Sequence, residues 1–318
     1  MKAVLFEDFG GHDRLKLVDD APPPAMDADE VLIELAYTGV NPVDWKIREG
    51  YLKDALPHEL PIIPGWDAAG DIADVGEAVL ADLKFGDKVY AYCRKPVVHD
   101  GTYAEAIAVP ASYVAKVPSN LTLAQAAAVP LAGLTAWQAL FDRAGLTGGH
   151  KLLVHAGAGG VGSFGVQFGK WAGATVYTTA SAPNHDYVRA LGADVAIDYR
   201  DEDFAERIAR AEPQGLDVVF DLVGGDVLRR SYELLKPGGA LVSIVDFPNE
   251  DLARRGGLKA CFHFVEPSGD QLQEIGDLIE AGEITSPEIE VMPLEEAAQA
   301  QQRSQAGHVR GKLVLKIK

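Results

Sequence analysis

The stretch that most constrains the fold of this chain is a short apolar segment, Lys151–Ala156, that leads directly into a glycine-rich turn. The turn has the GxGxxG pattern, and small and apolar residues at helical spacing follow it. A strand, such a turn and a helix in succession form a unit that binds the pyrophosphate of a dinucleotide at the helix N-terminus. Gly157 allows the tight turn, Gly159 lets the backbone approach the phosphates, and Gly162 lets the helix pack on the strand. The predicted cofactor-binding residues are therefore Gly157, Ala158, Gly159, Gly160, Val161 and Gly162. The alternative is that these glycines only allow the chain to turn and bind no ligand.

The next predicted strand, Ala174–Ala180, indicates which dinucleotide binds. A site for NAD places a carboxylate about 20 residues after the first glycine, where it accepts hydrogen bonds from the ribose. No carboxylate occurs here before Asp186, whereas Ser181, Asn184 and His185 can donate hydrogen bonds to a 2′-phosphate. The pattern therefore favours NADPH over NADH, with an ordinary turn in which Asn184 caps the next helix as the alternative.

The predicted secondary structure changes in character twice along the chain. Residues 1–120 are rich in short β-like segments, residues 121–266 alternate strand with helix, and a β-rich texture returns in residues 267–318. Alternating strands and helices predict an α/β, doubly wound domain with a parallel sheet, inserted into a β-rich domain. The six strands expected in that sheet are Lys151–Ala156, Ala174–Ala180, Val195–Asp198, Leu216–Leu222, Ala240–Val245 and Cys261–Val265.

Composition narrows the classes of partner. The net charge of −18 argues against binding to nucleic acid, which requires clustered Lys and Arg. No apolar run reaches the 18 residues of a membrane span, so we expect no membrane insertion. Two cysteines, Cys93 and Cys261, suit a reducing compartment, and we expect a cytoplasmic protein in which both are free thiols. A monomer or a homodimer is expected, with Ala240–Val245 as a strand through which two copies could pair.

Several motifs along the whole chain resemble those of the medium-chain dehydrogenase/reductase superfamily, in particular its zinc-independent, NADPH-dependent quinone oxidoreductase and enone reductase branch. The resemblance implies a GroES-like catalytic domain interrupted by a Rossmann domain, with the active site in the cleft between them. It also implies NADPH as cofactor and a small electrophilic carbonyl compound or a quinone as substrate. The motifs that carry it are Gly39–Asp44, Pro64–Gly70, Gly86–Val89, Ala132–Trp137, His155–Gly162, Leu191–Asp194 and Gly311–Leu315.

The chain departs from the zinc alcohol dehydrogenases of this superfamily at the positions of their metal ligands. Asn41 stands where those enzymes have Cys, and Trp66 stands where they have His. Catalytic zinc needs about three protein ligands, so we expect no metal. Without a Lewis acid to stabilise an alkoxide, the expected reaction is hydride transfer to a quinone or to the β-carbon of an enone. The enolate that develops needs only hydrogen-bond donors and a proton.

The resemblance also assigns roles to individual residues. It implies that Asn41 and Asp44 line the nicotinamide side of the cleft and that Thr135 holds the carboxamide. Val223 and Gly224 would lie beside the ribose, and Tyr199 near the adenosine end. Each has a plainer alternative: Asn41 and Asp44 could cap a short helix, Thr135 could cap a turn, and Tyr199 could end a strand.

Three further residues are candidates from their position and chemistry. Tyr51 is the only phenol near the predicted cleft loop and could donate to the enolate, although water could do the same. His308 and Lys312 near the C-terminus could meet the cofactor, or could lie on a solvated edge. The competing functions are a pathway-specific reductase of an enone or haloacrylate, and a non-catalytic, crystallin-like NADPH-binding protein.

Overall fold

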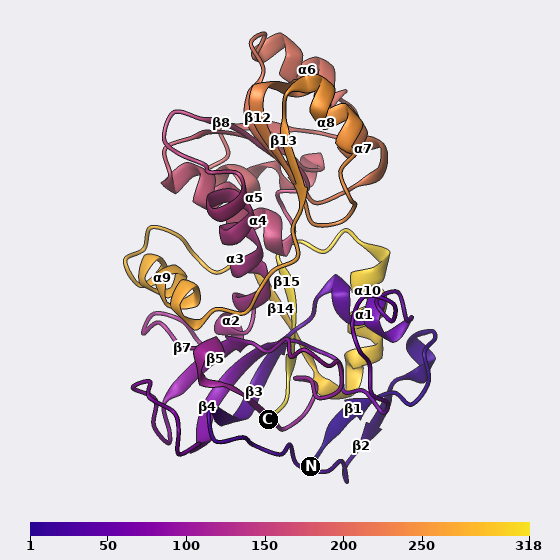
Figure 1. Cartoon of the computed structure of the whole chain (residues 1–318), viewed down its shortest axis with the longest axis vertical. Coiled ribbons are helices and arrows are strands. Elements are labelled where there is room, and N and C mark those ends of the chain that lie inside the picture. Colours follow the sequence, from indigo (N-terminus) through magenta and orange to yellow (C-terminus); the bar gives the residue numbers. More distant parts are fainter. The chain divides into compact units, whose positions relative to one another are not determined.

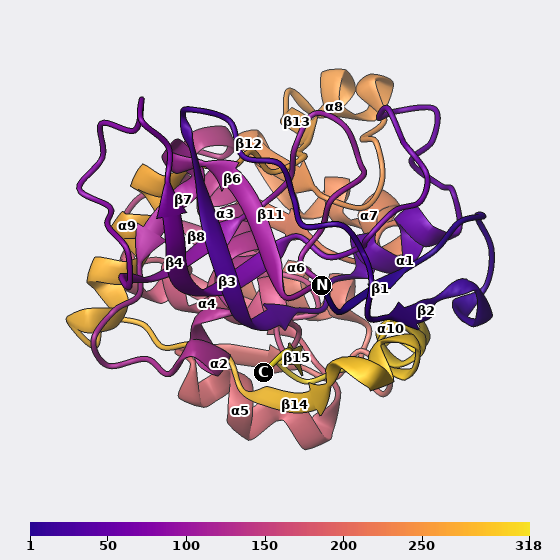
Figure 2. The same ribbon diagram turned by 90° about the horizontal axis from the view of Figure 1, so that it is seen from below.

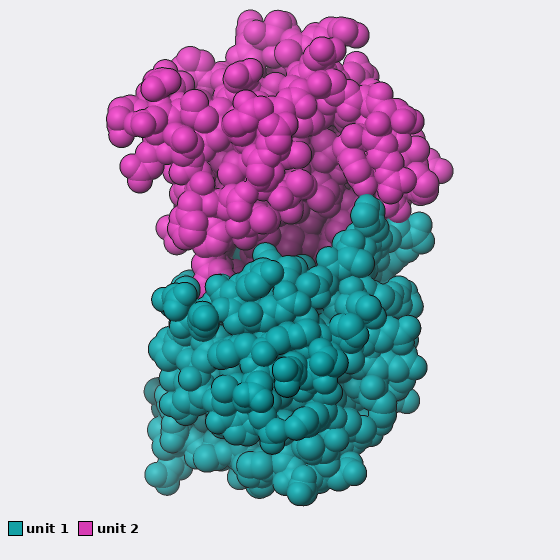
Figure 3. All heavy atoms as spheres, turned by 90° about the vertical axis from the view of Figure 1, so that its right-hand side faces the viewer, with its two compact units in different colours: residues 1–134, 266–318 teal, residues 135–265 magenta.

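The structure is a computed structural model that describes residues 1–318, and it divides into two compact units (Figure 3). The β-rich unit comprises Met1–Leu134 and Glu266–Lys318, and the α/β unit comprises Thr135–Val265. Residues 121–134 therefore group with the β-rich unit, because helix α2 (Leu123–Ala126) contacts its strands β3 and β4. Helix α3 (Pro130–Trp137) spans the boundary and continues as a π-helix over Gln138–Arg143.

The α/β unit contains a six-stranded sheet in which every pair of neighbours is parallel (Figure 1). The order is β10-β9-β8-β11-β12-β13, so the chain starts in the middle, moves to one edge and returns to build the other. The predicted doubly wound domain with a six-stranded parallel sheet is confirmed. Its strands are β8 (Lys151–Val154), β9 (Thr175–Thr179), β10 (Val195–Ile197), β11 (Leu216–Asp221), β12 (Leu235–Ser243) and β13 (Lys259–Phe262).

Helices cover both faces of this sheet because its strands are apolar on both sides. Helix α4 (Gly160–Trp171) lies so close to one face that a Cβ on Gly165 would stand 3.2 Å from both Phe220 and Val154. The opposite face buries Leu153, Val219 and Leu241 against three other helices. These are α6 (Phe204–Ala211), α7 (Gly225–Ser231) and α8 (Glu250–Gly256), while α5 (His185–Ala190) follows β9.

Strand β12 lies inside the sheet, with β11 on one side and β13 on the other. The expectation that Ala240–Val245 could pair two copies at a sheet edge is therefore wrong. Residues 240–243 form ladder pairs with both neighbours, so this segment has no free edge for a second copy. The edge strands are β10 and β13.

The β-rich unit is organised around the long strand β3 (Glu30–Gly39), which pairs with β4 (Asp67–Val75), β6 and β15. Figure 2 shows β3 and β4 side by side. The sheet order is β14-β15-β3-β4-β5-β7, with β6 on β3, so the last strand of the chain adjoins the first long one. The other strands are β1 (Ala3–Leu5), β2 (Lys16–Val18), β5 (Lys88–Tyr92), β6 (Ala106–Pro110), β7 (Val114–Lys116), β14 (Ile289–Pro293) and β15 (Lys312–Lys316).

Three further helices complete the β-rich unit: α1 (Pro42–Arg48), α9 (Gly269–Glu280) and α10 (Ala297–Ala306). No helix of the molecule combines the length and the apolar character needed to cross a bilayer.

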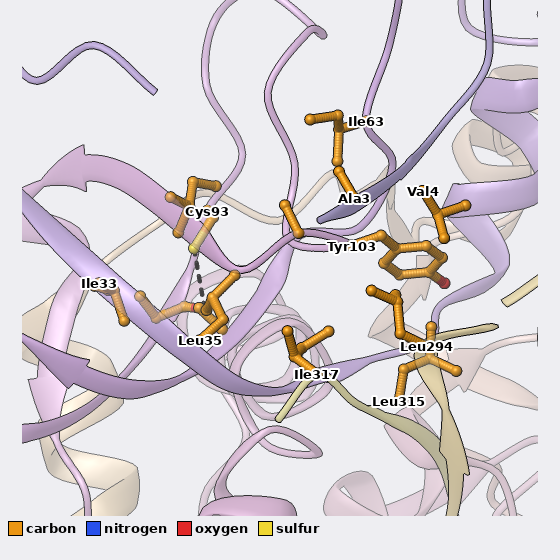
Figure 4. Close-up of a cluster of buried hydrophobic side chains, with 14 of the residues drawn as sticks. Ala3, Val4, Ile33, Leu35, Ile63, Cys93, Tyr103, Leu294, Leu315 and Ile317 are labelled. Atoms are coloured by element: carbon orange, nitrogen blue, oxygen red, sulfur yellow. Dashed lines mark hydrogen bonds between the residues drawn. The ribbon is translucent and has the colours of Figure 1, made fainter. Parts of the chain in front are cut away.

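The core of this unit joins segments from the beginning, middle and end of the chain (Figure 4). Val4, Leu35 and Leu315 are almost wholly buried together. Tyr103 contributes its ring to the same cluster, and this packing fixes the direction of its hydroxyl group. Strand β6 (Ala106–Pro110) begins only after this segment, because the amides of Thr102 and Tyr103 donate to the carbonyls of Gly65 and Pro64.

A fully buried arginine joins α1 to α10. The Arg48 side chain is 0% exposed, and its Nη1 donates to Gln301 Oε1 at 2.8 Å. Its Nε donates to the carbonyl of Gly10 at 3.0 Å, and its Nη2 to Glu49 Oε1 at 2.8 Å. A buried guanidinium costs several kcal/mol of desolvation unless such acceptors surround it.

Replacing Arg48 with alanine should lower the free energy of unfolding by about 3–5 kcal/mol, because its buried acceptors lose their donor and a cavity remains. Urea denaturation of the variant measures the effect. Arg254→Ala is the control, since Arg254 is exposed and pairs only with Asp251, and it should change stability by less than about 1 kcal/mol. Equal effects of the two substitutions would contradict this account of Arg48.

Candidate functional site

Of the three glycines that define the GxGxxG pattern after β8, packing requires two and does not require the third. A Cβ on Gly157 would lie 2.0 Å from Thr178 Oγ1, and one on Gly162 would lie 2.3 Å from the Ala156 carbonyl oxygen. A Cβ on Gly159 would meet only that carbonyl, at an ordinary 3.5 Å. No contact within the protein therefore requires glycine at position 159, and its small size suits the approach of a ligand phosphate to the backbone.

Helix α4 begins at Gly160, with Gly159 as its N-cap. The amide groups of the first turn, from Gly160 to Gly162, have no carbonyl partner within the helix. No acidic residue stands in this turn, so the positive end of the helix is not neutralised from within. The residues present fit the pyrophosphate of a dinucleotide.

The residues predicted to choose between NADPH and NADH come together at the ends of β9 and β10. Asn184 Nδ2 donates to Ser181 Oγ at 3.3 Å, and Asn184 makes no side-chain cap to α5. His185 Nε2 lies 3.1 Å from the Ala180 carbonyl oxygen. Tyr199 follows β10, is about half exposed, and carries the Arg200 guanidinium 5.7 Å from its ring centre.

The nearest carboxylate in this cluster, that of Asp198, accepts hydrogen bonds from backbone amides. Its Oδ2 accepts from the Ala182 amide at 3.1 Å and its Oδ1 from the Arg200 amide at 3.0 Å. Asp198 is only 7% exposed. It therefore holds the two turns together and does not take the position of a ribose-binding acid at the end of β9.

The turn after β11 is also held by a buried carboxylate. Asp221 accepts from the amides of Val223 at 3.1 Å and Gly224 at 3.0 Å, and from the Ser243 hydroxyl at 2.7 Å. Val223 is consequently presented with 47% of its surface exposed. Thr135, by contrast, is buried at the start of the α/β unit.

A buried histidine at the start of the glycine-rich turn forms hydrogen bonds to neighbouring elements of the α/β unit. His155 Nε2 lies 3.0 Å from Ser231 Oγ, whose own proton goes to the Val227 carbonyl. His155 Nδ1 lies 3.2 Å from Thr179 Oγ1. The ring therefore donates through Nε2 and accepts at Nδ1, and burial lowers the pKa of His155 to about 3.

Because the folded state excludes a proton that the unfolded chain binds below pH 6.5, His155 should make the protein less stable as the pH falls from about 6.5 toward 3. His155→Gln should make this dependence shallower by up to ~1.4 kcal/mol per pH unit. Urea unfolding of both proteins between pH 7.5 and pH 5 measures the difference. Identical pH dependences would show that His155 is protonated as readily in the folded state.

In the β-rich unit, the structure brings three predicted residues together: Asn41, Asp44 and Lys312. Asn41 is 2% exposed, and its Nδ2 donates to Asp67 Oδ2 at 2.8 Å. Lys312 is 5% exposed, so it does not lie on a solvated edge, and its Nζ donates to Asn41 Oδ1. The Lys312 ammonium also donates to Asp67 Oδ2 at 3.2 Å, so Asn41, Asp67 and Lys312 form a buried triad.

Asp44 lies beside this triad and holds the start of α1. Its Oδ2 accepts from the Asn41 backbone amide and from the Tyr103 hydroxyl, at 2.8 and 2.9 Å. Its Oδ1 is buried without a partner. Burial outweighs these hydrogen bonds and raises the pKa of Asp44 to about 7.

The other two candidates of this unit are exposed. Tyr51 is 66% exposed and meets Trp45 edge to face at 5.8 Å. His308 is exposed and has a positive φ of 67° in the loop between α10 and β15.

Sequence reasoning missed two buried participants, Asp67 and Tyr103. A carboxylate directly after Trp66 and before the small residues Ala68 and Ala69 was a usable signal for Asp67. Tyr103 carried no local signal, because only the tertiary packing directs its hydroxyl to Asp44. At the neighbouring position Trp66 is buried against Tyr92, and no three His, Cys, Asp or Glu side chains are grouped to hold a metal ion.

Comparison with known proteins identifies both parts of the chain. Residues 27–119 match the alcohol dehydrogenase GroES-like domain, and residues 191–315 match the model described as zinc-binding dehydrogenase. The chain is 36% identical to an NADPH-dependent alkenal/one oxidoreductase, chloroplastic, of Arabidopsis thaliana, over 99% of this chain and 79% of that protein. The chain belongs to the quinone oxidoreductase and enone reductase branch of the medium-chain dehydrogenase/reductase superfamily.

Solved structures of this branch agree with that assignment. The quinone oxidoreductase from Coxiella burnetii superposes with a TM-score of 0.89 at 36% identity, covering 100% of this chain and 99% of that one. The Escherichia coli quinone oxidoreductase complexed with NADPH gives 0.88 at 28% identity, with both chains fully covered. Another relative is longer: the chain spans about half of the synaptic vesicle membrane protein VAT-1 homolog of Danio rerio, at 37% identity.

Replacing Ser181 with aspartate should reverse the preference between cofactors, because the new charge repels a 2′-phosphate and can accept from a free ribose hydroxyl. We expect the affinity for NADPH to fall at least about tenfold, or ~1.4 kcal/mol. Calorimetric titration with NADPH and NADH measures both affinities, and Ser181→Ala is the control that removes the hydroxyl without adding a charge. An unchanged ratio of affinities in Ser181→Asp would place the 2′-phosphate elsewhere.

Proposed function

We propose that this protein is an NADPH-dependent oxidoreductase that reduces a quinone or the C=C bond of an α,β-unsaturated carbonyl compound without a metal. The observation that carries the proposal is the strand, glycine turn and helix at Gly157–Gly162, where Gly159 is free of any packing requirement. The relatives named alkenal/one oxidoreductase and quinone oxidoreductase support the same class of reaction.

The residues that would hold the cofactor belong to the α/β unit. The first turn of α4 would bind the pyrophosphate through backbone amides. Ser181, Asn184 and His185 would bind the 2′-phosphate, and Tyr199 would adjoin the adenosine. Val223 and Gly224 would adjoin the nicotinamide ribose, and Thr135 would hold the carboxamide. When bound, NADPH would supply a hydride, that is, one proton transferred together with two electrons.

The β-rich unit supplies the polar group for the acceptor. Asn41 occupies the position where the zinc enzymes have a thiolate, and Trp66 has no lone pair to offer a metal. An amide N–H can stabilise the oxygen of an enolate, whose negative charge is spread over oxygen and carbon. It stabilises a full alkoxide much less well, so reduction of an isolated carbonyl is disfavoured.

The reaction also needs one proton at the α-carbon of an enone, so that enone, hydride and proton give the saturated ketone. The exposed Tyr51 phenol or a water molecule delivers this proton. Asp44 acts as a positioning residue, because its carboxylate holds the Asn41 backbone amide and the Tyr103 hydroxyl.

We propose a monomer or a homodimer in the cytoplasm. The two cysteines support the location, since both are free thiols and Cys93 is fully buried. One relative is chloroplastic, so fractionation of the source cell is the direct test of location. Light scattering of the purified protein measures its oligomeric state.

With a simple vinyl ketone the enzyme should reduce the C=C bond and leave the carbonyl intact. NADPH deuterated on the transferred face should place deuterium on the β-carbon, as read by NMR of the product. An allylic alcohol labelled at the carbinol carbon would contradict the role of Asn41. Absence of turnover with a panel of enones and quinones, despite tight NADPH binding, would indicate a binding protein instead.

A further inference from the structure

Lys312 lies in a position that leaves it no hydrogen-bond donor for a ligand. It is the first residue of β15, and its Nζ donates to three acceptors of the β-rich unit. These are the Val40 carbonyl at 3.3 Å, Asn41 Oδ1, and Asp67 Oδ2 at 3.2 Å. An ammonium group has three protons, so all of them are used inside the protein.

The triad fixes the orientation of the Asn41 amide. The oxygen and nitrogen of an amide can usually exchange places within a hydrogen-bond network. Here Lys312 can only donate and the Asp67 carboxylate can only accept, so Oδ1 must face Lys312 and Nδ2 must face Asp67. Nδ2 gives one proton to Asp67 at 2.8 Å, which leaves exactly one N–H of the Asn41 side chain for another acceptor.

We propose that Lys312 and Asp67 are positioning residues that hold the Asn41 amide as a one-proton donor to the carbonyl oxygen of the substrate. This inference rests on the proposed function and specifies how its donor is prepared. The positive charge of the Lys312 ammonium next to Oδ1 draws electron density toward that oxygen, which strengthens the remaining N–H as a donor. Asp67 is itself held by the Leu131 amide, which donates to its Oδ1 at 2.7 Å.

Within the triad, the positive charge of Lys312 and the negative charge of Asp67 compensate each other. Lys312 and Asp67 are 5% and 0% exposed at their side chains, so removing one of them leaves the other buried and unpaired. A single substitution therefore lowers stability as well as activity. Removing both charges separates the two effects, because the neutral pair leaves no buried charge but no longer fixes the Asn41 amide.

The experiment compares Lys312→Met, the double variant Lys312→Met/Asp67→Asn, and Asn41→Ala. The single Lys312 variant should unfold at lower urea than the wild type, and the double variant should regain most of that midpoint. In both, kcat for enone reduction should fall by about 10²-fold, while the Kd for NADPH stays unchanged. Lys316→Met, on the exposed face of the same strand, is the matched control and should keep wild-type kcat and midpoint.

A double-mutant cycle tests whether Lys312 acts through Asn41. Adding Lys312→Met to Asn41→Ala should cause no further loss of kcat, because the group being positioned is already absent. Multiplicative losses would show that Lys312 acts independently of Asn41. Weaker binding of NADPH to Lys312→Met would mean that Lys312 contacts the cofactor. Recovery of kcat in the double variant would show that the triad has only a structural role. Either result overturns the proposal.

A measurement without turnover separates this inference from the proposed function. The side-chain amide of Asn41, assigned by its loss in Asn41→Ala, should exchange its hydrogens more slowly in the wild type than in the double variant. Equal exchange rates overturn the positioning role even if the enzyme reduces enones. If the wild-type protein reduces no enone or quinone, the proposed function is refuted, and with it the role of Asn41 as a donor to the substrate. Slow hydrogen exchange of the Asn41 amide would in that case still show that Lys312 and Asp67 hold this side chain.

Discussion

The buried ion pair between Lys312 and Asp67 joins parts of the β-rich unit that are far apart in the sequence. Lys312 begins the last strand, Asp67 begins β4, and Asn41 between them is the N-cap of α1. Asp67 also accepts from the amide of Leu131, near the start of α3. Four chain segments that are far apart in sequence therefore meet at one carboxylate. Because both charges are removed from water, their placement has to be accurate, and accurate placement is what a hydrogen-bond donor in an active site needs.

The α/β unit uses buried polar groups in a similar way at the carboxyl ends of its strands. Asp221 accepts hydrogen bonds from backbone amides of the turn after β11, and Asp198 accepts them from the turns after β9 and β10. His155 joins β8 to β9 and α7 as a neutral ring. Val223 and Tyr199, two of the residues proposed to meet the cofactor, remain about half exposed on these turns. The rigid sheet thus supplies the positions, and short turns supply the contacts.

The chemistry proposed for the protein follows from what its polar groups can stabilise. A thiolate–zinc centre stabilises an alkoxide, whereas the Asn41 amide supplies a single N–H. An acceptor that spreads its charge over several atoms suits the weaker donor, and quinones and enones have this property. The raised pKa of Asp44 reflects the same water-poor surroundings, since burial is its largest cause.

The sequence by itself determined the α/β unit almost completely. Local signals carry that fold: apolar strands, helical spacing and the glycines at 157 and 162, whose need the tertiary contacts confirm. It also indicated Asn41, Asp44 and Lys312 as candidates, but neither their partners nor the interior position of β12. Those depend on contacts between residues such as Asn41 and Lys312, 271 positions apart, and no local pattern records which distant strands become neighbours. Only the tertiary structure decided that a lysine near the C-terminus turns inward, because burying an ammonium is favourable only where the fold has already assembled its acceptors.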